Sequence, residues 1–281
     1  MKNFFGSLDH GWIIRFIEHR VGDPRIISLI KKWLKAGVME AGVFEESEAG
    51  TPQGGSISVL LSNLYLHYVL DLWFEKAIKP RLKGESYLVR YIDDFIVCFG
   101  YKNDAERFVE VLAKRLSKFS LTLEPGKTRL IEFGRFASQN AKAKGKKPET
   151  FYFLGFTHYC TTNRKGNYQV GRRTEKSRLR RSIKKLLSKM REMKHWKIEE
   201  QVDKINQILR GHYNYYGMGG NYQSLHKIYY QAILFLKKML SSRSWKGHVT
   251  WELFNIIIKR HPILRPYIKI PYGDFKKYVM L

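Results

Sequence analysis

Residues 87–99 read YLVRYIDDFIVCF, two apolar runs on either side of a pair of aspartates. The runs Tyr87–Ile92 and Phe95–Phe99 are rich in strand-forming residues, and their short separation predicts a tight hairpin. Asp93 and Asp94 are expected at its tip, where two neighbouring carboxylates repel each other and strain the turn. A divalent cation offsets both costs, and Mg²⁺ commonly takes one or two carboxylates together with substrate phosphates. The pair therefore predicts a metal site, and the alternative is an ordinary acidic surface turn.

A glycine-rich loop and a long helix are expected before this hairpin. Residues 50–58 read GTPQGGSIS, and residues 60–66 read LLSNLYL. We expect an apolar helix from about Ile57 to Ala77, ended by Pro80, because proline cannot continue a helix. Nearer the N-terminus, the spacing of apolar residues predicts two short helices and then a hairpin over residues 37–46.

The chain after the hairpin is expected to change from mixed structure to helices. Residues 103–118 carry apolar side chains on one helical face, and a short strand is expected around Arg129–Phe133. Residues 137–149 are rich in Lys, Gly and Ala, which favours a mobile connection. Strands are expected near Phe151–Tyr159 and Tyr168–Arg172, and helices follow from about Thr174.

Charge is unevenly distributed along the 281 residues. Lys and Arg number 51 against 25 Asp and Glu, which gives a formal net charge of +26. Residues 1–135 hold 20 basic and 17 acidic residues, whereas residues 136–281 hold 31 and 8. Such an excess indicates a polyanionic partner, either nucleic acid or an anionic membrane surface. We therefore expect two domains with different tasks, residues 1–135 and residues 136–281.

Ten basic residues fall between positions 172 and 191, where an apolar stripe also has helical spacing. This pattern predicts an amphipathic helix with a cationic ridge, and the alternative is a solvated charged face. The candidate contacts to RNA phosphates are Arg172, Arg173, Lys176, Arg178, Arg180, Arg181, Lys184 and Lys185. Tyrosines between positions 213 and 230 are suited to stack on unpaired bases, with core packing as the alternative for at least half of them.

The remaining composition limits the class of protein. Cys98 and Cys160 are too few for a disulfide scaffold or a multi-cysteine zinc site, and reduced thiols suit the cytoplasm. No apolar run approaches the roughly 20 residues of a membrane-spanning helix. The first residues also lack the apolar stretch of a signal peptide. We therefore expect a cytoplasmic protein with no membrane partner.

Five sequence blocks, in order, resemble those of one family. Residues 91–94 (YIDD) resemble the Tyr-x-Asp-Asp motif of reverse transcriptases, and residues 50–66 resemble the matching block of group II intron reverse transcriptase/maturases. The blocks GKT at 126–128, FLGF at 153–156 and LRGHYNYY at 209–216 are also similar. The resemblance covers essentially the whole chain. It implies an α+β fold: a partial polymerase palm with an antiparallel sheet and helices, then primer-grip strands and a basic, mainly helical thumb or maturase X domain.

The resemblance implies catalytic roles for three residues. Asp93 is expected to bind the catalytic Mg²⁺ ions, two in the intact family site, with Mn²⁺ as a possible substitute. Asp94 is expected to support the same metal site. Lys127 matches a lysine that neutralises or protonates the leaving group, and the alternative is an ordinary surface lysine.

It also implies four residues that contact nucleotides or the primer. Gln53 matches the residue that contacts the sugar of the incoming nucleotide, with a turn amide as the alternative. Phe5 matches the aromatic residue that screens out a ribose 2′-hydroxyl, with core packing as the alternative. Leu154 and Gly155 match the primer grip, where a missing side chain lets a nucleic-acid backbone approach; the alternative is a glycine in a strand bulge.

The family performs RNA-templated DNA synthesis by two-metal nucleotidyl transfer and assists RNA splicing. The implied partners are group II intron RNA, an RNA template with a DNA primer, and deoxynucleoside triphosphates. The family's first metal-binding aspartate falls immediately before Met1, which implies an N-terminal truncation that removes the fingers and the first palm strands. We therefore expect this chain alone to be weakly active or inactive, with a separate chain as a possible source of the missing part. The alternatives are an RNA-binding splicing cofactor without polymerase activity and an inactive remnant.

Overall fold

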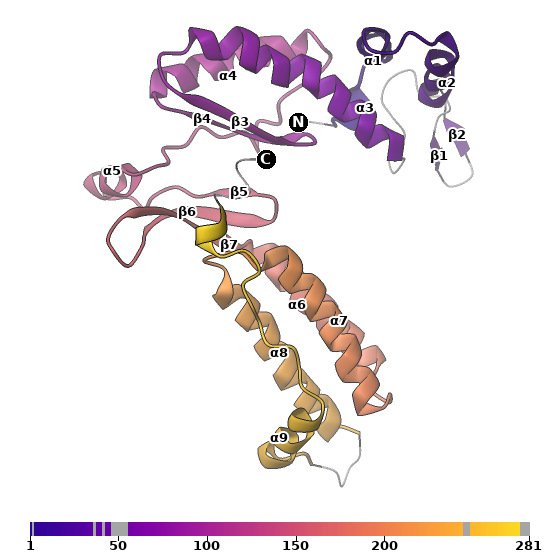
Figure 1. Cartoon of the computed structure of the whole chain (residues 1–281), viewed down its shortest axis with the longest axis vertical. Coiled ribbons are helices and arrows are strands. Elements are labelled where there is room, and N and C mark those ends of the chain that lie inside the picture. The colour runs from indigo at the N-terminus through magenta and orange to yellow at the C-terminus, as the bar shows by residue number, and fades with distance from the viewer. Residues whose placement is uncertain (2, 36–37, 41–42, 46–55, 244–247, 276–281) are drawn as a thin grey trace. The chain divides into compact units, whose positions relative to one another are not determined.

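The chain forms two compact units, Met1–Leu130 and Ile131–Leu281. The computed structural model (Figure 1) describes residues 1, 3–35, 38–40, 43–45, 56–243 and 248–275. Each unit has its own hydrophobic core. Helices and small antiparallel sheets occur in both units, so the predicted α+β class is confirmed.

Unit 1 surrounds its core with helices and carries two separate two-stranded antiparallel sheets, β1–β2 and β3–β4. The predicted hairpins over residues 37–46 and 87–99 are both present. The elements are η1 (Phe5–Ser7), α1 (His10–Glu18), α2 (Pro24–Lys35), β1 (Val38–Glu40), β2 (Val43–Glu45), α3 (Ser56–Leu66), η2 (His67–Asp71), η3 (Phe74–Ile78), η4 (Lys79–Arg81), β3 (Ser86–Tyr91), β4 (Asp94–Phe99) and α4 (Lys102–Ser117).

One helical segment, from α3 to η4, forms the centre of unit 1. Tyr65, Leu70 and Phe74 on this segment are fully buried in the core. Pro80 lies in the 3-10 turn η4 that ends the segment, slightly later than expected. The segment Ile57–Arg81 has 25 residues and is long and apolar enough, by length and composition, to cross a membrane. The expectation that no segment reaches this length and composition is therefore wrong.

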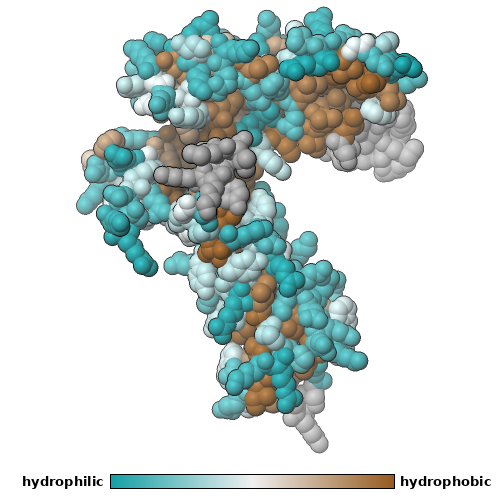
Figure 2. Space-filling model, viewed as in Figure 1, coloured by the Kyte–Doolittle hydropathy of each residue, from teal (hydrophilic) through white to brown (hydrophobic). Residues whose placement is uncertain are grey.

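Helix α2 leaves part of its apolar face on the surface of unit 1. Ile26, Leu29 and Trp33 are each more than 40% exposed. Figure 2 shows apolar side chains gathered in the region that α1, α2 and α3 form. Within the described part of the chain, nothing covers this face of α2.

Unit 2 combines a three-stranded antiparallel sheet, in the order β5-β6-β7, with a set of long helices. Helices α6, α7 and α8 pack along one another (Figure 1), and Ile205, Leu209 and Leu236 are fully buried between them. The elements are α5 (Ala137–Ala143), β5 (Phe151–Phe153), β6 (Phe156–Thr162), β7 (Tyr168–Thr174), α6 (Lys176–Glu192), α7 (Ile198–Tyr216), α8 (Tyr222–Ser241), α9 (Trp251–Arg260) and η5 (Tyr272–Asp274).

Three sequence predictions in this region are wrong. The structure has no strand at residues 129–133, and a short helix, α5, replaces part of the connection predicted at 137–149. The strand predicted at 151–159 is two strands, β5 and β6, separated by a turn at Leu154–Gly155. Each error concerns a short element, for which local pattern is weak compared with packing.

Asn221 joins the sheet of unit 2 to its helices. Its side-chain oxygen accepts the backbone N–H of Thr174 (2.7 Å). Its side-chain nitrogen donates to the Thr174 hydroxyl (2.8 Å) and to the Tyr216 carbonyl (2.8 Å). Because Asn221 is fully buried, these bonds fix the end of β7 against the end of α7 and the start of α8.

We predict that Tyr65→Phe destabilises unit 1 by about 1–3 kcal/mol, the cost of a buried group that loses its hydrogen-bond partner. The Tyr65 hydroxyl donates to the buried Phe119 carbonyl at 2.8 Å. Urea unfolding measures the loss. Tyr87→Phe removes a hydroxyl from an exposed tyrosine and should change stability by less than about 0.5 kcal/mol. Equal effects of the two variants would contradict the prediction.

We also predict that unit 2 loses stability as the pH falls from about 6.5 to about 4. Burial lowers the pKa of His158 to about 4, with a further contribution from the positive charge of Arg172, and burial alone lowers the pKa of His212 to about 4. The unfolded chain, with histidine pKa values near 6.5, takes up these protons first, so acidification favours unfolding.

Urea midpoints measured across this pH range test the prediction. The double variant His158→Phe and His212→Phe keeps an aromatic ring at both positions, where His158 stacks on Phe151 and His212 contacts Tyr216. The urea midpoint of this double variant should fall less on acidification than that of the unmodified chain. An unchanged slope would remove the two histidines as the cause.

Candidate active site and nucleic-acid interface

The β3–β4 hairpin closes with a connection of only two residues. Tyr91 pairs with Asp94, so Ile92 and Asp93 form the turn. The sequence pattern predicts both aspartates at the tip, but Asp94 is the first residue of β4. Asp93 and Asp94 nevertheless remain adjacent at the end of the hairpin, one in the turn and one on the strand.

Ile92 adopts an unfavourable backbone conformation in this turn. Its φ is +56°, in the left-handed region, where a β-branched residue is rare. Two-residue hairpin connections need a positive φ and normally place glycine there. A non-glycine residue in this region costs about 1–3 kcal/mol and persists only where its surroundings enforce it. The packing of the Ile92 side chain against the core of unit 1 is one such restraint.

The two carboxylates suit a divalent cation in their chemistry and accessibility. The Asp93 side chain is 33% exposed, and Asp94 is exposed. The backbone nitrogen of Met1 lies 3.8 Å from Asp93 Oδ2. Within the described residues, no group of three or more His, Cys, Asp and Glu forms a metal cluster. A pair of carboxylates still matches Mg²⁺, which completes its coordination with water and substrate phosphates.

Arg90, which no sequence motif singles out as a site residue, supports this turn from β3. Its Nε and Nη2 donate to the two carboxylate oxygens of Asp71, at 2.8 Å and 2.5 Å. Its Nη1 donates to the side-chain oxygen of Asn63 (2.9 Å) and to the Ile92 carbonyl (2.9 Å). The sequence signal was an arginine within an otherwise apolar strand, because a buried charge needs a partner.

Three other predicted residues of unit 1 lie in different settings. Phe5, in η1, is half-buried against the core and contacts Phe4 edge to face. Lys127 is exposed in a turn, where its N–H donates to the Glu124 carbonyl (3.0 Å). In the described part of unit 1, no hydrogen bond or ion pair joins Lys127 to Asp93 or Asp94. Gln53 lies outside the described residues.

In unit 2, Leu154 and Gly155 form the two-residue turn between β5 and β6. Phe153 pairs with Phe156 across it, and the φ angles of the two turn residues are +48° and +79°. Two positive φ angles are typical of a type I′ turn, whose twist matches that of the strands it joins. The feature is therefore a hairpin turn and not a strand bulge.

The chain's own side chains occupy the space beside Gly155. A Cβ on Gly155 would lie 3.0 Å from the Tyr216 hydroxyl and 3.3 Å from Cδ of Arg178. The Tyr215 hydroxyl donates to the Leu154 carbonyl (3.1 Å), and the Glu175 N–H donates to the Gly155 carbonyl (3.0 Å). These contacts hold the turn against the start of α6 and the end of α7.

Helix α6 carries the predicted cationic ridge. Leu186 and Met190 are buried in the core of unit 2, which confirms the amphipathic pattern. Among the described residues, ion pairs join two of the ridge cations to carboxylates, Arg178 to Glu175 (3.2 Å) and Lys189 to Glu192 (2.5 Å). Seven cations on the helix are exposed: Lys176, Arg178, Arg180, Arg181, Lys184, Lys185 and Arg191.

Two further arginines of the predicted set lie on β7 and stack on aromatic rings. The guanidinium of Arg172 lies 4.5 Å from the ring centre of Phe275. That of Arg173 lies 5.4 Å from the ring centre of Tyr159. These contacts orient the two side chains without neutralising their charge.

The tyrosines of unit 2 divide between core and surface. Tyr213 is fully buried, and its hydroxyl donates to the Leu264 carbonyl (3.2 Å). Tyr215, Tyr222 and Tyr230 are each about half exposed, at 56%, 49% and 50%. The exposed members are therefore the ones available to stack on bases.

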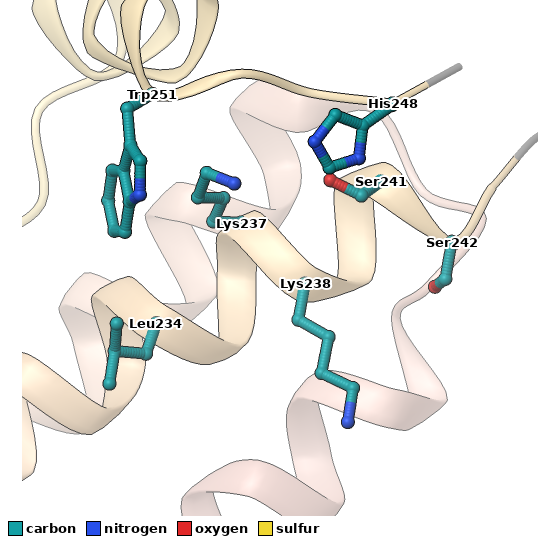
Figure 3. Close-up of a pocket in the computed structure, with 7 residues that line it drawn as sticks. All are labelled: Leu234, Lys237, Lys238, Ser241, Ser242, His248 and Trp251. Carbon is teal, nitrogen blue, oxygen red and sulfur yellow. The ribbon is translucent and has the colours of Figure 1, made fainter.

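A cavity of about 420 Å³ lies between the end of α8 and the start of α9. Figure 3 shows the side chain of Lys237 beside Trp251, and its ammonium lies 4.8 Å from the ring centre. Among the described residues that line the cavity, two are lysines and none is a carboxylate. The lining residues are Leu234, Lys237, Lys238, Ser241, Ser242, His248 and Trp251.

Comparison with known proteins found several relatives, and their coverage of this chain differs. The group II intron-encoded protein LtrA of Lactococcus lactis subsp. cremoris is 37% identical over 91 residues, 30% of this chain and 15% of that protein. Protein YkfC of Escherichia coli is 36% identical over 87 residues, 31% of this chain and 23% of that protein. The putative COX1/OXI3 intron 1 protein of Saccharomyces cerevisiae is 22% identical over 99% of this chain and 42% of that protein. The chain spans less than half the length of each of these relatives.

A family description also matches more than half of the chain. Residues 1–158 match the reverse transcriptase (RNA-dependent DNA polymerase) family. The matched region contains the β3–β4 hairpin with Asp93 and Asp94, and it extends to the turn at Leu154–Gly155. The chain therefore belongs to the reverse transcriptase family.

Proposed function

We propose that this chain carries part of the polymerase site and the RNA-binding surface of a group II intron reverse transcriptase/maturase. The observation that carries the proposal is the strained hairpin turn, which presents Asp93 next to Asp94. Backbone strain in a non-glycine residue is concentrated at functional sites. The similarity to intron-encoded proteins supports the intron assignment.

Asp93 and Asp94 would hold the catalytic metal ions, Mg²⁺ or Mn²⁺. Such an ion, when bound, stabilises negative charge on the oxygens of the transferred phosphate. The two carboxylates would fix the position of the substrate phosphates relative to the primer 3′-hydroxyl. Lys127, which is exposed and has a long flexible stem, would approach the leaving pyrophosphate once substrate is bound.

Four residues would contact the substrates. Phe5 and Gln53 would contact the incoming deoxynucleoside triphosphate. Leu154 and Gly155 would contact the primer through the outer side of their turn, because Tyr215 and Glu175 already use the two carbonyls.

The positive surface of unit 2 would bind the template–primer and the intron RNA. Exposed cations on α6, the stacked arginines of β7 and the lysines of the α8–α9 cavity belong to the same unit. Phosphate contacts of this kind supply most of the sequence-independent affinity for nucleic acid. This unit, with a core of its own, also supports the second candidate function, a splicing cofactor that binds RNA without polymerase activity.

We predict that Asp93→Asn weakens Mn²⁺ binding by more than about 100-fold in the presence of RNA template, DNA primer and a deoxynucleoside triphosphate. The substitution removes a charged metal ligand. Its effect on affinity should therefore be larger than the loss of about 10–100-fold that follows removal of an outer-shell partner. Electron paramagnetic resonance of free Mn²⁺ measures the affinity, and any primer extension by the chain should fall with it.

Asp23→Asn provides the matched control, because Asp23 lies at the start of α2 and its side chain is also partly exposed, at 39%. This variant should bind Mn²⁺ as the unmodified chain does. If Asp93→Asn and Asp23→Asn bind Mn²⁺ equally, the polymerase proposal fails and the splicing-cofactor function remains.

We predict that replacing Arg181, Lys184 and Lys185 by Gln lowers RNA affinity and its dependence on salt. Three lost phosphate contacts should reduce the slope of log affinity against log salt concentration by about two. Filter binding to intron RNA at several salt concentrations measures the slope. The control replaces Lys142, Lys146 and Lys147, three exposed lysines of the same unit, and should change the slope less. Equal changes would indicate a diffuse charge effect and not a binding ridge.

A further inference from the structure

The guanidinium of Arg90 links the β3–β4 hairpin to the central helical segment of unit 1. It binds Asp71 through two parallel hydrogen bonds, at 2.8 Å and 2.5 Å, and Asn63 through a third at 2.9 Å. Both partners lie on the central helical segment, Asn63 in α3 and Asp71 in η2. The side chain of Arg90 is only 12% exposed. Its position is therefore fixed by the core of the unit.

The fourth hydrogen bond of Arg90 reaches the turn itself. Nη1 donates to the Ile92 carbonyl at 2.9 Å. That carbonyl belongs to the peptide group between Ile92 and Asp93, so the bond fixes the orientation of the backbone that leads into Asp93. Ile92 is also the residue with φ +56°. The bond therefore holds Ile92 in a left-handed conformation that a β-branched residue does not favour.

We propose that Arg90 is a positioning residue that, anchored by Asp71 and Asn63, holds the Ile92–Asp93 peptide in its strained turn and so orients the Asp93 carboxylate. The consequence for metal binding rests on the proposed role of Asp93. The restraint on the turn is independent of that role and can be measured separately.

The geometry requires arginine at this position. A guanidinium presents its N–H groups in a planar fork, which lets it bind a carboxylate with two atoms while a third donates elsewhere. A lysine ammonium has no such fork and cannot hold both oxygens of Asp71 and the Ile92 carbonyl in this arrangement. Arg90→Lys should therefore behave like Arg90→Gln.

The direct test is the φ angle of Ile92 in solution. A positive φ brings the amide hydrogen close to the Hα of the same residue and gives a strong nuclear Overhauser effect. Labelling Tyr carbonyls with ¹³C and Ile amides with ¹⁵N selects the Tyr–Ile peptides, which occur at residues 91–92 and 267–268. Ile268 is not among the residues with positive φ and serves as an internal control.

The unmodified chain should show a strong signal at Ile92 and a weak one at Ile268. Arg90→Gln and Arg90→Lys should weaken the Ile92 signal to the level of Ile268. Arg115→Gln is the matched control, because Arg115 is also partly buried and donates to the carbonyls of Val69 and Tyr68, away from the turn. A strong Ile92 signal that persists in Arg90→Gln would overturn the proposal.

Metal binding then tests the consequence for Asp93. Arg90→Gln should weaken Mn²⁺ binding by about 10–100-fold, as expected for loss of an outer-shell partner. Adding Ile92→Gly to Arg90→Gln should restore much of this affinity, because glycine accepts a positive φ without cost. Adding Ile92→Ala to Arg90→Gln also removes most of the isoleucine side chain, but alanine still has the energetic cost of a positive φ. This double variant should therefore not regain Mn²⁺ affinity.

The two proposals fail in different ways. If Asp93→Asn leaves Mn²⁺ binding unchanged while Arg90→Gln abolishes the Ile92 signal, the metal role is wrong and the restraint by Arg90 stands. If Asp93→Asn weakens Mn²⁺ binding but Arg90→Gln changes neither readout, the metal role stands and the restraint by Arg90 is wrong.

Discussion

The connection between β3 and β4 has two residues, and a turn of this length favours a positive φ, which Ile92 adopts. Glycine would meet the requirement at no steric cost, but the chain has a β-branched residue here. Compensation comes from the side chain of Ile92, which packs on the core of unit 1, and from Arg90, which holds its carbonyl. The position of the Asp93 carboxylate therefore depends on contacts from α3 and η2, far from it in sequence.

Unit 2 also has a two-residue turn with a non-glycine residue at positive φ, and different groups stabilise it. Leu154 occupies a left-handed conformation at φ +48°, and Gly155 follows at +79°. Hydrogen bonds from the Tyr215 hydroxyl and the Glu175 N–H hold the two carbonyls. A strained non-glycine residue thus occurs in each of these two turns, at the two hairpins whose sequences resemble the polymerase motif and the primer grip. Strain of this kind persists where the surroundings over-determine a conformation that function uses.

The sequence predicted the elements with strong periodicity and failed where distant residues decide the outcome. The hairpin at 87–99 and the amphipathic helix α6 follow from local pattern, and both are present. The turn was placed one residue late, because repulsion between the aspartates was visible in the sequence and the pairing of Tyr91 with Asp94 was not. Arg90 and Asp71 are 19 positions apart, so no local pattern joins them. Leu154–Gly155 was assigned to one strand because its turn depends on α6 and α7, which contact it only in the folded unit.

Helix α6 of unit 2 forms although the cations on its exposed side repel one another. Like charges four residues apart occur at Lys176–Arg180, Arg180–Lys184 and Arg181–Lys185, and each such pair costs about 0.2–0.5 kcal/mol. Burial of a side chain such as Leu186 or Met190 contributes about 1.5–3 kcal/mol, so the apolar side of the helix outweighs the repulsion on its polar side. The helix can therefore form before any polyanion arrives. Binding of a polyanion would relieve the same repulsion between cations. The relief of this repulsion would therefore contribute to the affinity of unit 2 for the polyanion.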